Sequence, residues 1–94
     1  MEGRSFRIFL GTIPDYSQEG VKGVRISGVA KNSPAEKAGL KSGDIITEFD
    51  QTKIENIYDY VYVLQSIKPS LKTNIKISRN QKTEILEITP VLKD

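Results

Sequence analysis

Short hydrophobic runs separated by turn-forming residues dominate the chain, which is the pattern of a small, sheet-rich domain. Residues 24–29 (VRISGV) alternate between apolar and polar with period two, as a half-buried strand does. The stretch from Pro14 to Gly23 contains several helix breakers and predicts a loop. A turn at residues 79–82 joins the last two strands as a hairpin. The predicted strands cover residues 6–10, 24–29, 45–49, 52–54, 73–78 and 83–91.

A short helix is predicted after residue 33, because its start and stop signals agree. Ser33 is a good N-cap, and Pro34 suits the first helical position. Glu36 stands three residues after Ser33, which predicts a capping box. Gly39 suits the left-handed residue that ends a helix. These four residues therefore predict both ends of the helix.

A second helix is predicted at residues 57–66, where Asn56 can cap it and Asp59 falls in the favourable first turn. Its apolar residues have the spacing of one helical stripe. Tyr58 and Tyr62 fall off that stripe and are candidates for an interface with a partner. The stripe consists of Ile57, Tyr60, Val61, Leu64 and Ile67.

The order of these elements is β, β, α, β, β, α, β, β, with mostly antiparallel strands. This order predicts an α+β fold in which a small, partly closed antiparallel sheet or barrel is flanked by two α-helices. The 94 residues have room for one hydrophobic core, so we expect a single domain over residues 1–94 with its core at about 6–92. Because strand-like sequence begins so soon after the start, we expect the chain to be a piece of a longer protein.

The composition removes several kinds of chemistry. The chain has no Cys, which excludes disulfides and thiolate sites, and no His, which excludes Ser-His catalysis and imidazole-bound zinc. The acidic residues form no pair or cluster at a recognisable spacing. Asp44 follows a glycine in a bend, where we expect it to hydrogen-bond nearby backbone. We therefore expect no catalytic residues, no metal and no cofactor in this chain.

Charge and hydropathy exclude two further classes of partner. The net charge is +2, from 14 basic and 12 acidic residues, which is too small to indicate nucleic-acid binding. The apolar runs are far shorter than the roughly 20 residues that span a membrane, so we expect no membrane insertion by this segment. We expect the isolated domain to be a monomer.

The segment SPAEKAGLKSGDIITEFD, residues 33–50, resembles the most recognisable stretch of bacterial-type PDZ domains: a helix of small residues, then Gly-Leu, then Gly-Asp and two hydrophobic residues. The resemblance extends from about residue 9 to residue 90. The element order resembles the permuted PDZ domains of secreted and periplasmic proteases, which implies a PDZ-like fold and an extracytoplasmic parent. FLGTIPDYS, GVRISGV and NIYDYVYVLQSIKP resemble, more narrowly, the PDZ domain of some bacterial zinc aminopeptidases.

The resemblance implies that an extended peptide adds as a strand to an exposed sheet edge. Backbone N–H groups of Leu10, Gly11 and Thr12 would then hold the terminal carboxylate of the peptide. Ile57 stands where some PDZ domains carry a histidine, which implies an apolar ligand side chain two positions before the peptide's end. The predicted carboxylate-binding loop is Phe9, Leu10, Gly11 and Thr12, and the predicted groove residues are Ile13, Pro14, Ile57, Val61 and Leu64.

Two residues depart from the family pattern. Thr12 replaces a bulky apolar residue, and Pro14 has no N–H to donate where the groove strand should bond the ligand. Two functions therefore stay open. The first is a non-catalytic module that binds peptide or protein C-termini, for substrate recognition or regulation in a bacterial peptidase. The second is a structural or regulatory domain that docks on another domain of its parent, with a weak or unused groove.

Overall fold

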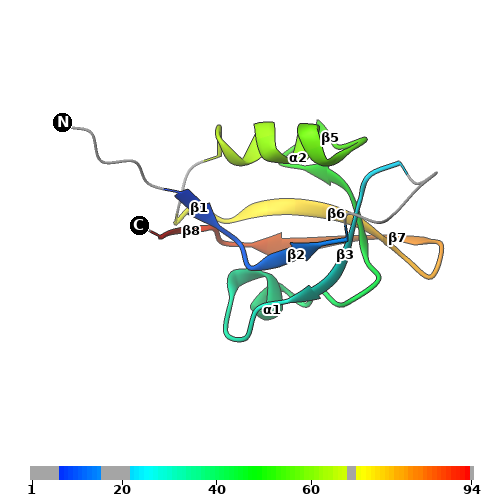
Figure 1. The fold of residues 1–94 in the computed structure, drawn as a ribbon, viewed down its shortest axis with the longest axis horizontal. Helices are drawn as coiled ribbons and strands as arrows, with labels where there is room; N and C mark the ends of the chain where they lie inside the picture. Colours follow the sequence, from blue (N-terminus) through cyan, green and yellow to red (C-terminus); the bar gives the residue numbers. More distant parts are fainter. Residues whose placement is uncertain (1–6, 16–21, 68–69, 94) are drawn as a thin grey trace.

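Two helices lie on opposite sides of an antiparallel sheet in the computed structural model, which describes residues 7–15, 22–67 and 70–93 (Figure 1). The longer helix, α2, covers one side, and the short helix α1 lies on the other. The elements are β1 (Arg7–Phe9), β2 (Thr12–Pro14), β3 (Val24–Val29), α1 (Pro34–Ala38), β4 (Ile45–Phe49), β5 (Thr52–Lys53), α2 (Ile57–Leu64), β6 (Thr73–Arg79), β7 (Lys82–Ile88) and β8 (Val91–Lys93).

The main sheet has the strand order β2-β3-β4-β6-β7, and β5 pairs with β4. Strands β1 and β8 form a separate two-stranded ribbon in which Phe9 faces Val91. All of these pairings are antiparallel. They confirm the predicted α+β class with two flanking helices, although the described strands do not close into a barrel. Strand β2 is at the edge of the main sheet, so one side of its backbone is open.

The structure contains two short strands that the sequence pattern does not predict. Residues 12–14 form β2, although the predicted loop begins at Pro14; a proline is tolerated there because it ends a strand at a sheet edge. The predicted strand 83–91 ends at Ile88 in β7, and a separate strand β8 begins at Val91, because the buried Pro90 between them has no N–H to donate to a ladder. Phe6 and residues 16–21 of the predicted strand and loop lie outside the described residues.

Helix α1 begins at the predicted cap, but its capping box is arranged differently. The Glu36 N–H donates to Ser33 Oγ at 3.2 Å, as predicted. The Glu36 carboxylate accepts from the Asn32 N–H at 2.7 Å rather than from the Ser33 N–H, which donates to the Ala30 carbonyl at 3.3 Å. Gly39 ends the helix with a φ of 99°, as its sequence position predicts.

One cluster of buried side chains forms the core, and its members come from the sheet and from both helices. Its centre has no exposed surface and comes from strands β3, β4 and β6. Burying each of these large apolar side chains stabilises the fold by about 1.5–3 kcal/mol. The fully buried central residues are Ile26, Ile46, Phe49, Ile75 and Ile77.

An ion pair between a buried carboxylate and a partly exposed guanidinium joins the bend before β4 to the end of β6. Asp44 is 1% exposed, and the Arg79 guanidinium bonds both of its carboxylate oxygens, at 2.8 Å from Nε and 2.6 Å from Nη2. The Lys41 N–H also donates to Asp44 at 2.9 Å, and Arg79 Nη2 donates to the Gly39 carbonyl at 2.8 Å. Burial alone raises the pKa of Asp44, but the Arg79 bonds and charge and the Lys41 bond outweigh it and hold that pKa below 3.8. Asp44 thus makes the backbone bond predicted for it and an ion pair that was not predicted.

We expect Arg79→Ala to lower the free energy of unfolding by about 3 kcal/mol at pH 7, because the Asp44 carboxylate stays buried without its cation. In the wild type the low pKa of Asp44 adds stability above about pH 4, and this contribution is lost as pH falls through the folded-state pKa. In the variant, burial raises that pKa instead, so the deficit shrinks as pH falls from 7 towards 4. Urea unfolding at both pH values measures this.

The matched control for this prediction is Lys53→Ala, which breaks the exposed pair between Lys53 and Glu55. We expect it to cost less than about 1 kcal/mol at either pH, because water screens exposed pairs. An Arg79→Ala deficit that is the same at pH 7 and pH 4 would contradict the role given to the Asp44–Arg79 pair.

Candidate functional site

The backbone of Leu10 and Gly11 is docked on the start of helix α1. The Ala35 N–H donates to the Leu10 carbonyl, and the Ala30 N–H donates to the Gly11 carbonyl, each at 2.8 Å. Gly11 has a φ of 88°, and a Cβ at this position would lie 2.1 Å from the Ser33 Cβ. Position 11 therefore requires glycine both for its backbone conformation and for its close approach to α1.

This docking directs two backbone N–H groups away from α1 and β3. In a trans peptide unit the C=O and the N–H point in opposite directions. The Leu10 C=O points at Ala35, so the Gly11 N–H points away from α1. The Gly11 C=O points at Ala30, so the Thr12 N–H points away from the end of β3. Two successive N–H groups that both point away from the elements on which the loop is docked can receive an anion such as a carboxylate.

The open edge of β2 presents alternate backbone groups. The Gly11 carbonyl and the Asp15 N–H are both bonded on the β3 side, the latter to the Arg25 carbonyl at 2.9 Å. Because alternate residues of a strand point their backbone groups to the same side, Thr12 and Pro14 point to the open side. Thr12 can offer both an N–H and a C=O to an added strand, whereas Pro14 can offer only its C=O.

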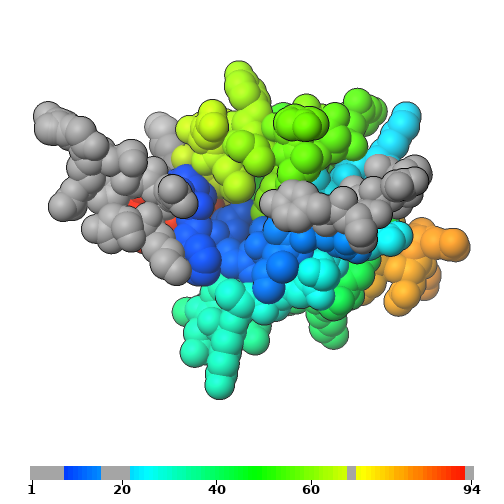
Figure 2. Space-filling view, viewed as in Figure 1, coloured from blue at the N-terminus to red at the C-terminus, as the bar shows by residue number. Residues whose placement is uncertain are grey.

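A groove of about 220 Å³ lies between this open edge and helix α2. In Figure 2 the blue segment of β1 and β2 lies directly beneath the yellow-green helix α2, with the surface hollowed between them. The walls are apolar apart from the backbone and the hydroxyl groups of one Thr and one Tyr. The lining residues are Ile8, Phe9, Leu10, Gly11, Thr12, Pro14, Ile57, Tyr60, Val61 and Leu64.

Of the residues that the sequence placed at the site, Ile13 is the one that does not line this groove. Side chains alternate between the faces of a strand, so Ile13 lies on the face opposite to Thr12 and Pro14 and is 48% exposed. This corrects its predicted place. The prediction also missed Ile8 and Tyr60 as lining residues. The sequence pattern could have indicated both residues, because Ile8 lies in the predicted first strand and Tyr60 lies on the predicted apolar stripe of the second helix.

Helix α2 has a groove face and a core face rather than one stripe. Tyr60 and Val63 are each 2% exposed and pack in the core, whereas Val61 is 46% exposed beside the groove. The predicted stripe included Val61 and left out Val63, so it mixed the two faces. Tyr58 and Tyr62 lie off both faces and are largely exposed, in keeping with their predicted position.

One hydrogen bond joins the two walls of the groove. The Thr12 hydroxyl of β2 lies 2.6 Å from the Tyr60 hydroxyl of α2, and either group can donate. The Tyr60 ring is buried against Phe49, with 6.4 Å between ring centroids. Burial raises the pKa of Tyr60 to about 12, although the bond to Thr12 opposes this, so the phenol is neutral at physiological pH. A core residue thus places its polar end in the groove.

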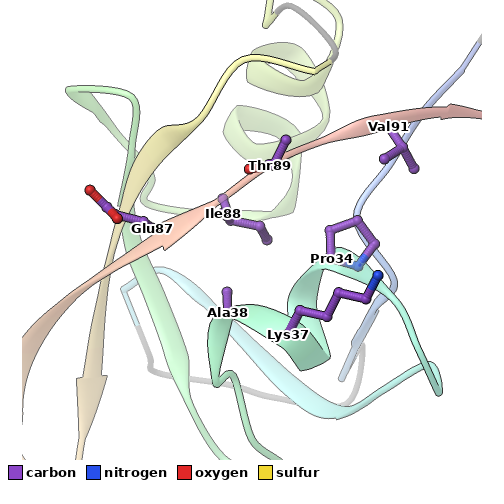
Figure 3. A pocket seen from close by; sticks show the side chains of 7 residues that line it. All are labelled: Pro34, Lys37, Ala38, Glu87, Ile88, Thr89 and Val91. Atoms are coloured by element: carbon purple, nitrogen blue, oxygen red, sulfur yellow. The ribbon is translucent and has the colours of Figure 1, made fainter.

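A second hollow, of about 320 Å³, lies between α1 and the segment that connects β7 to β8. Figure 3 shows Ala38 of α1 and Ile88 of β7 on its facing walls, while Lys37 extends alongside Pro34 and the Glu87 carboxylate points away from α1. No set of polar groups converges on this hollow among the residues that line it. The groove beside β2 is therefore the candidate site.

In the parts of the chain that the structure describes, no three His, Cys, Asp or Glu side chains gather into a cluster that could hold a metal ion. The described helices include none that is long and apolar enough to cross a membrane.

Comparisons with known proteins agree on one family. The family model described as PDZ domain matches residues 9–89. The chain is 36% identical over 97 residues to a DegP-like periplasmic serine endoprotease of Marinomonas sp., covering 94% of this chain but only 21% of that protein. Five other curated relatives, at 30–42% identity, are also named as serine proteases, and two proteins of Staphylococcus aureus, at 39% identity over 66% of this chain, are named as zinc metalloproteases.

Solved structures share the fold. An HtrA-type protease, AlgW with a decapeptide, matches with a TM-score of 0.83 at 21% identity, over 95% of this chain and 30% of that one. The HtrA3 PDZ domain bound to a phage-derived ligand (FGRWV) matches with a TM-score of 0.73 at 21% identity, over 95% of this chain and 89% of that one.

An aminopeptidase N family protein of Idiomarina loihiensis also matches, with a TM-score of 0.77 at 21% identity, over 99% of this chain and 16% of that one. This identity shows a shared fold and no more. The curated relatives described above are named as serine proteases or as zinc metalloproteases and none of them as an aminopeptidase, so the narrower prediction of an aminopeptidase is not supported.

We expect Gly11→Ala to lower the free energy of unfolding by about 3 kcal/mol, since alanine must adopt a left-handed backbone and also displace Ser33. Gly39→Ala is the matched control. The φ of Gly39 is 99°, but nothing lies within 4 Å of the added Cβ, so we expect the free energy of unfolding to fall by only about 1–2 kcal/mol. Urea unfolding of both variants tests this. If the two variants lose the same free energy of unfolding, the contact between position 11 and Ser33 is not a tight one.

Proposed function

This chain belongs to the PDZ domain family, and on that premise we propose that its groove binds an extended peptide as a strand added to the open edge of β2. The observation that carries the proposal is the pair of N–H groups of Gly11 and Thr12, which point away from their own structure at the end of an open strand. A terminal carboxylate placed there receives charge-assisted hydrogen bonds. The peptide then runs along β2 beside α2.

The apolar walls of the groove favour a ligand with apolar side chains. Ile57, Val61 and Leu64 stand on α2 with spacings of four and three residues, which place them along one face. Ile57 has no polar group that could bond a ligand hydroxyl. We therefore propose an apolar side chain two positions before the peptide's end, packed against Ile57.

We infer that the parent of this domain is an extracytoplasmic peptidase, in which the chain serves substrate recognition or regulation without a catalytic role of its own. Periplasmic serine proteases among the relatives support this, and the chain spans about 14–21% of their length. In such a parent the peptide bond is cleaved elsewhere, and the groove selects or positions a segment of the substrate.

A second function, docking onto another domain of the same parent, is favoured by one observation. Pro14 removes a donor from the edge strand, and a proline at a sheet edge is a common means of preventing strand addition. In this case the groove is weak or unused, and another domain of the parent covers it.

The test of peptide binding is an NMR titration of the isotope-labelled domain with peptides that end in apolar residues, each paired with its C-terminal amide. We expect chemical-shift changes at Gly11, Thr12, Ile57 and Val61, which disappear when the carboxylate is amidated. If no peptide binds at millimolar concentration, C-terminal recognition is excluded and docking within the parent is favoured. If the amides bind as well as the acids, the carboxylate has no role.

We expect Pro14→Ala to tighten the binding of peptides that reach position 14 about five-fold, because it restores one backbone donor worth about 1 kcal/mol. Calorimetric titration with peptides of increasing length measures this. A dipeptide, which ends before position 14, serves as the matched control and should bind the variant and the wild type equally. An unchanged affinity for the longer peptides would mean that the ligand does not pair with β2 at this position.

A further inference from the structure

We propose that the hydrogen-bonded pair of Thr12 and Tyr60 forms a polar floor in the groove that selects peptides with a short terminal side chain, such as alanine, over long apolar ones. The inference rests on the proposed function, since it concerns the ligand of the same groove. It adds Thr12 and Tyr60 as residues that determine specificity. Neither the family model nor the names of the relatives assign such a role.

The position of the pair places it next to the terminal residue of a ligand. The Thr12 N–H is one of the two groups proposed to hold the carboxylate, so the Cα of the terminal residue must come close to Thr12. The Thr12 side chain points towards α2, where its oxygen meets the Tyr60 oxygen at 2.6 Å. A terminal side chain that enters the groove from this Cα therefore approaches the pair.

The two walls meet at this point. Thr12 comes from β2 and Tyr60 from α2, and both line the groove. The Tyr60 ring is 2% exposed and packs on the core, so it lies under the groove rather than across its mouth. A ligand side chain can pass between β2 and α2 only down to the level of this hydrogen bond. Passing further would separate the two hydroxyl groups.

The floor is polar because one hydroxyl hydrogen of the Thr12–Tyr60 pair has no partner within the pair. Two hydroxyl groups carry two hydrogens, and one bond between them uses one hydrogen. The other hydrogen can bond water while the groove is open. A long apolar side chain would displace that water and leave the hydrogen without an acceptor, which is unfavourable for a buried donor. A methyl side chain is short enough to leave the water in place.

The test is a series of peptides that are identical except for the last residue, which is Ala, Val, Leu or Phe. We expect wild-type domain to bind the Ala peptide about ten-fold more tightly than the Leu peptide, because the cost of the unsatisfied buried donor exceeds the gain from the additional apolar surface that Leu buries. The double variant Thr12→Val with Tyr60→Phe removes both hydroxyls at nearly constant volume. We expect it to bind the Leu peptide about ten-fold more tightly than wild type does, with the Ala peptide within two-fold.

Tyr62→Phe is the matched control, because it removes a phenolic hydroxyl from an exposed position of the same helix. It should leave the ratio of the Ala and Leu affinities unchanged. The double variant is used in place of Thr12→Val or Tyr60→Phe alone, because replacing both partners of a buried hydrogen bond with apolar groups is close to neutral for stability.

The outcomes separate this inference from the proposed function. If wild-type domain binds none of the peptides, peptide binding itself fails and the inference fails with it. If wild type binds them but prefers Leu or Phe, or if the double variant keeps the wild-type ratio, peptide binding stands and the polar floor is overturned. A preference for Ala that is present in wild type and in Tyr62→Phe and is lost in the double variant supports the floor.

Discussion

The contact between Gly11 and the first turn of α1 is the constraint on which the site depends. The Leu10 and Gly11 carbonyls are bound by the N–H groups of Ala35 and Ala30, and there is no room for a Cβ beside Ser33. The bond from Ala35 also satisfies an N–H of the first turn of α1, which lacks a partner within the helix. The helix and the loop thus fix each other. The direction of the Gly11 and Thr12 N–H groups is a consequence of that docking rather than of the loop sequence alone.

The groove has two walls that are held by different means. Strand β2 is held through its pairing with β3 and through the docked loop, while α2 is held by the burial of Tyr60 and Val63 in the core. The Thr12–Tyr60 hydrogen bond joins them directly. By contrast, the ion pair of Asp44 and Arg79 does not line the groove and joins the bend before β4 to the end of β6. Its role is therefore in stability, and recognition is left to the groove's backbone N–H groups, its apolar walls and the Thr12–Tyr60 hydroxyl pair.

Pro14 has opposite effects on the two properties of the edge strand. It removes a donor that an added peptide could use, and it also makes unwanted pairing with other strands less favourable. A groove that holds a ligand by its terminal carboxylate and its last side chain needs less of the ladder than one that reads a long segment. Thr12, the other departure from the family pattern, leaves room that the Tyr60 phenol fills from the opposite wall. For the peptide binding proposed above, these two departures favour a short recognition sequence that is read mainly at its end.

Local signals in the sequence determined most of the elements. The Ser33 cap, the left-handed Gly39, the Asn56 cap and the alternation at 24–29 each act within a few residues, and each is found in the structure. The family pattern located the loop and the helix of the candidate site. Only the tertiary structure could decide contacts between residues far apart in the chain: the pairing of β1 with β8, the Asp44–Arg79 pair, and the meeting of Thr12 with Tyr60. It also decided that Ile13 faces away and that Val63 rather than Val61 is buried, because a face becomes a core face only when another element packs on it.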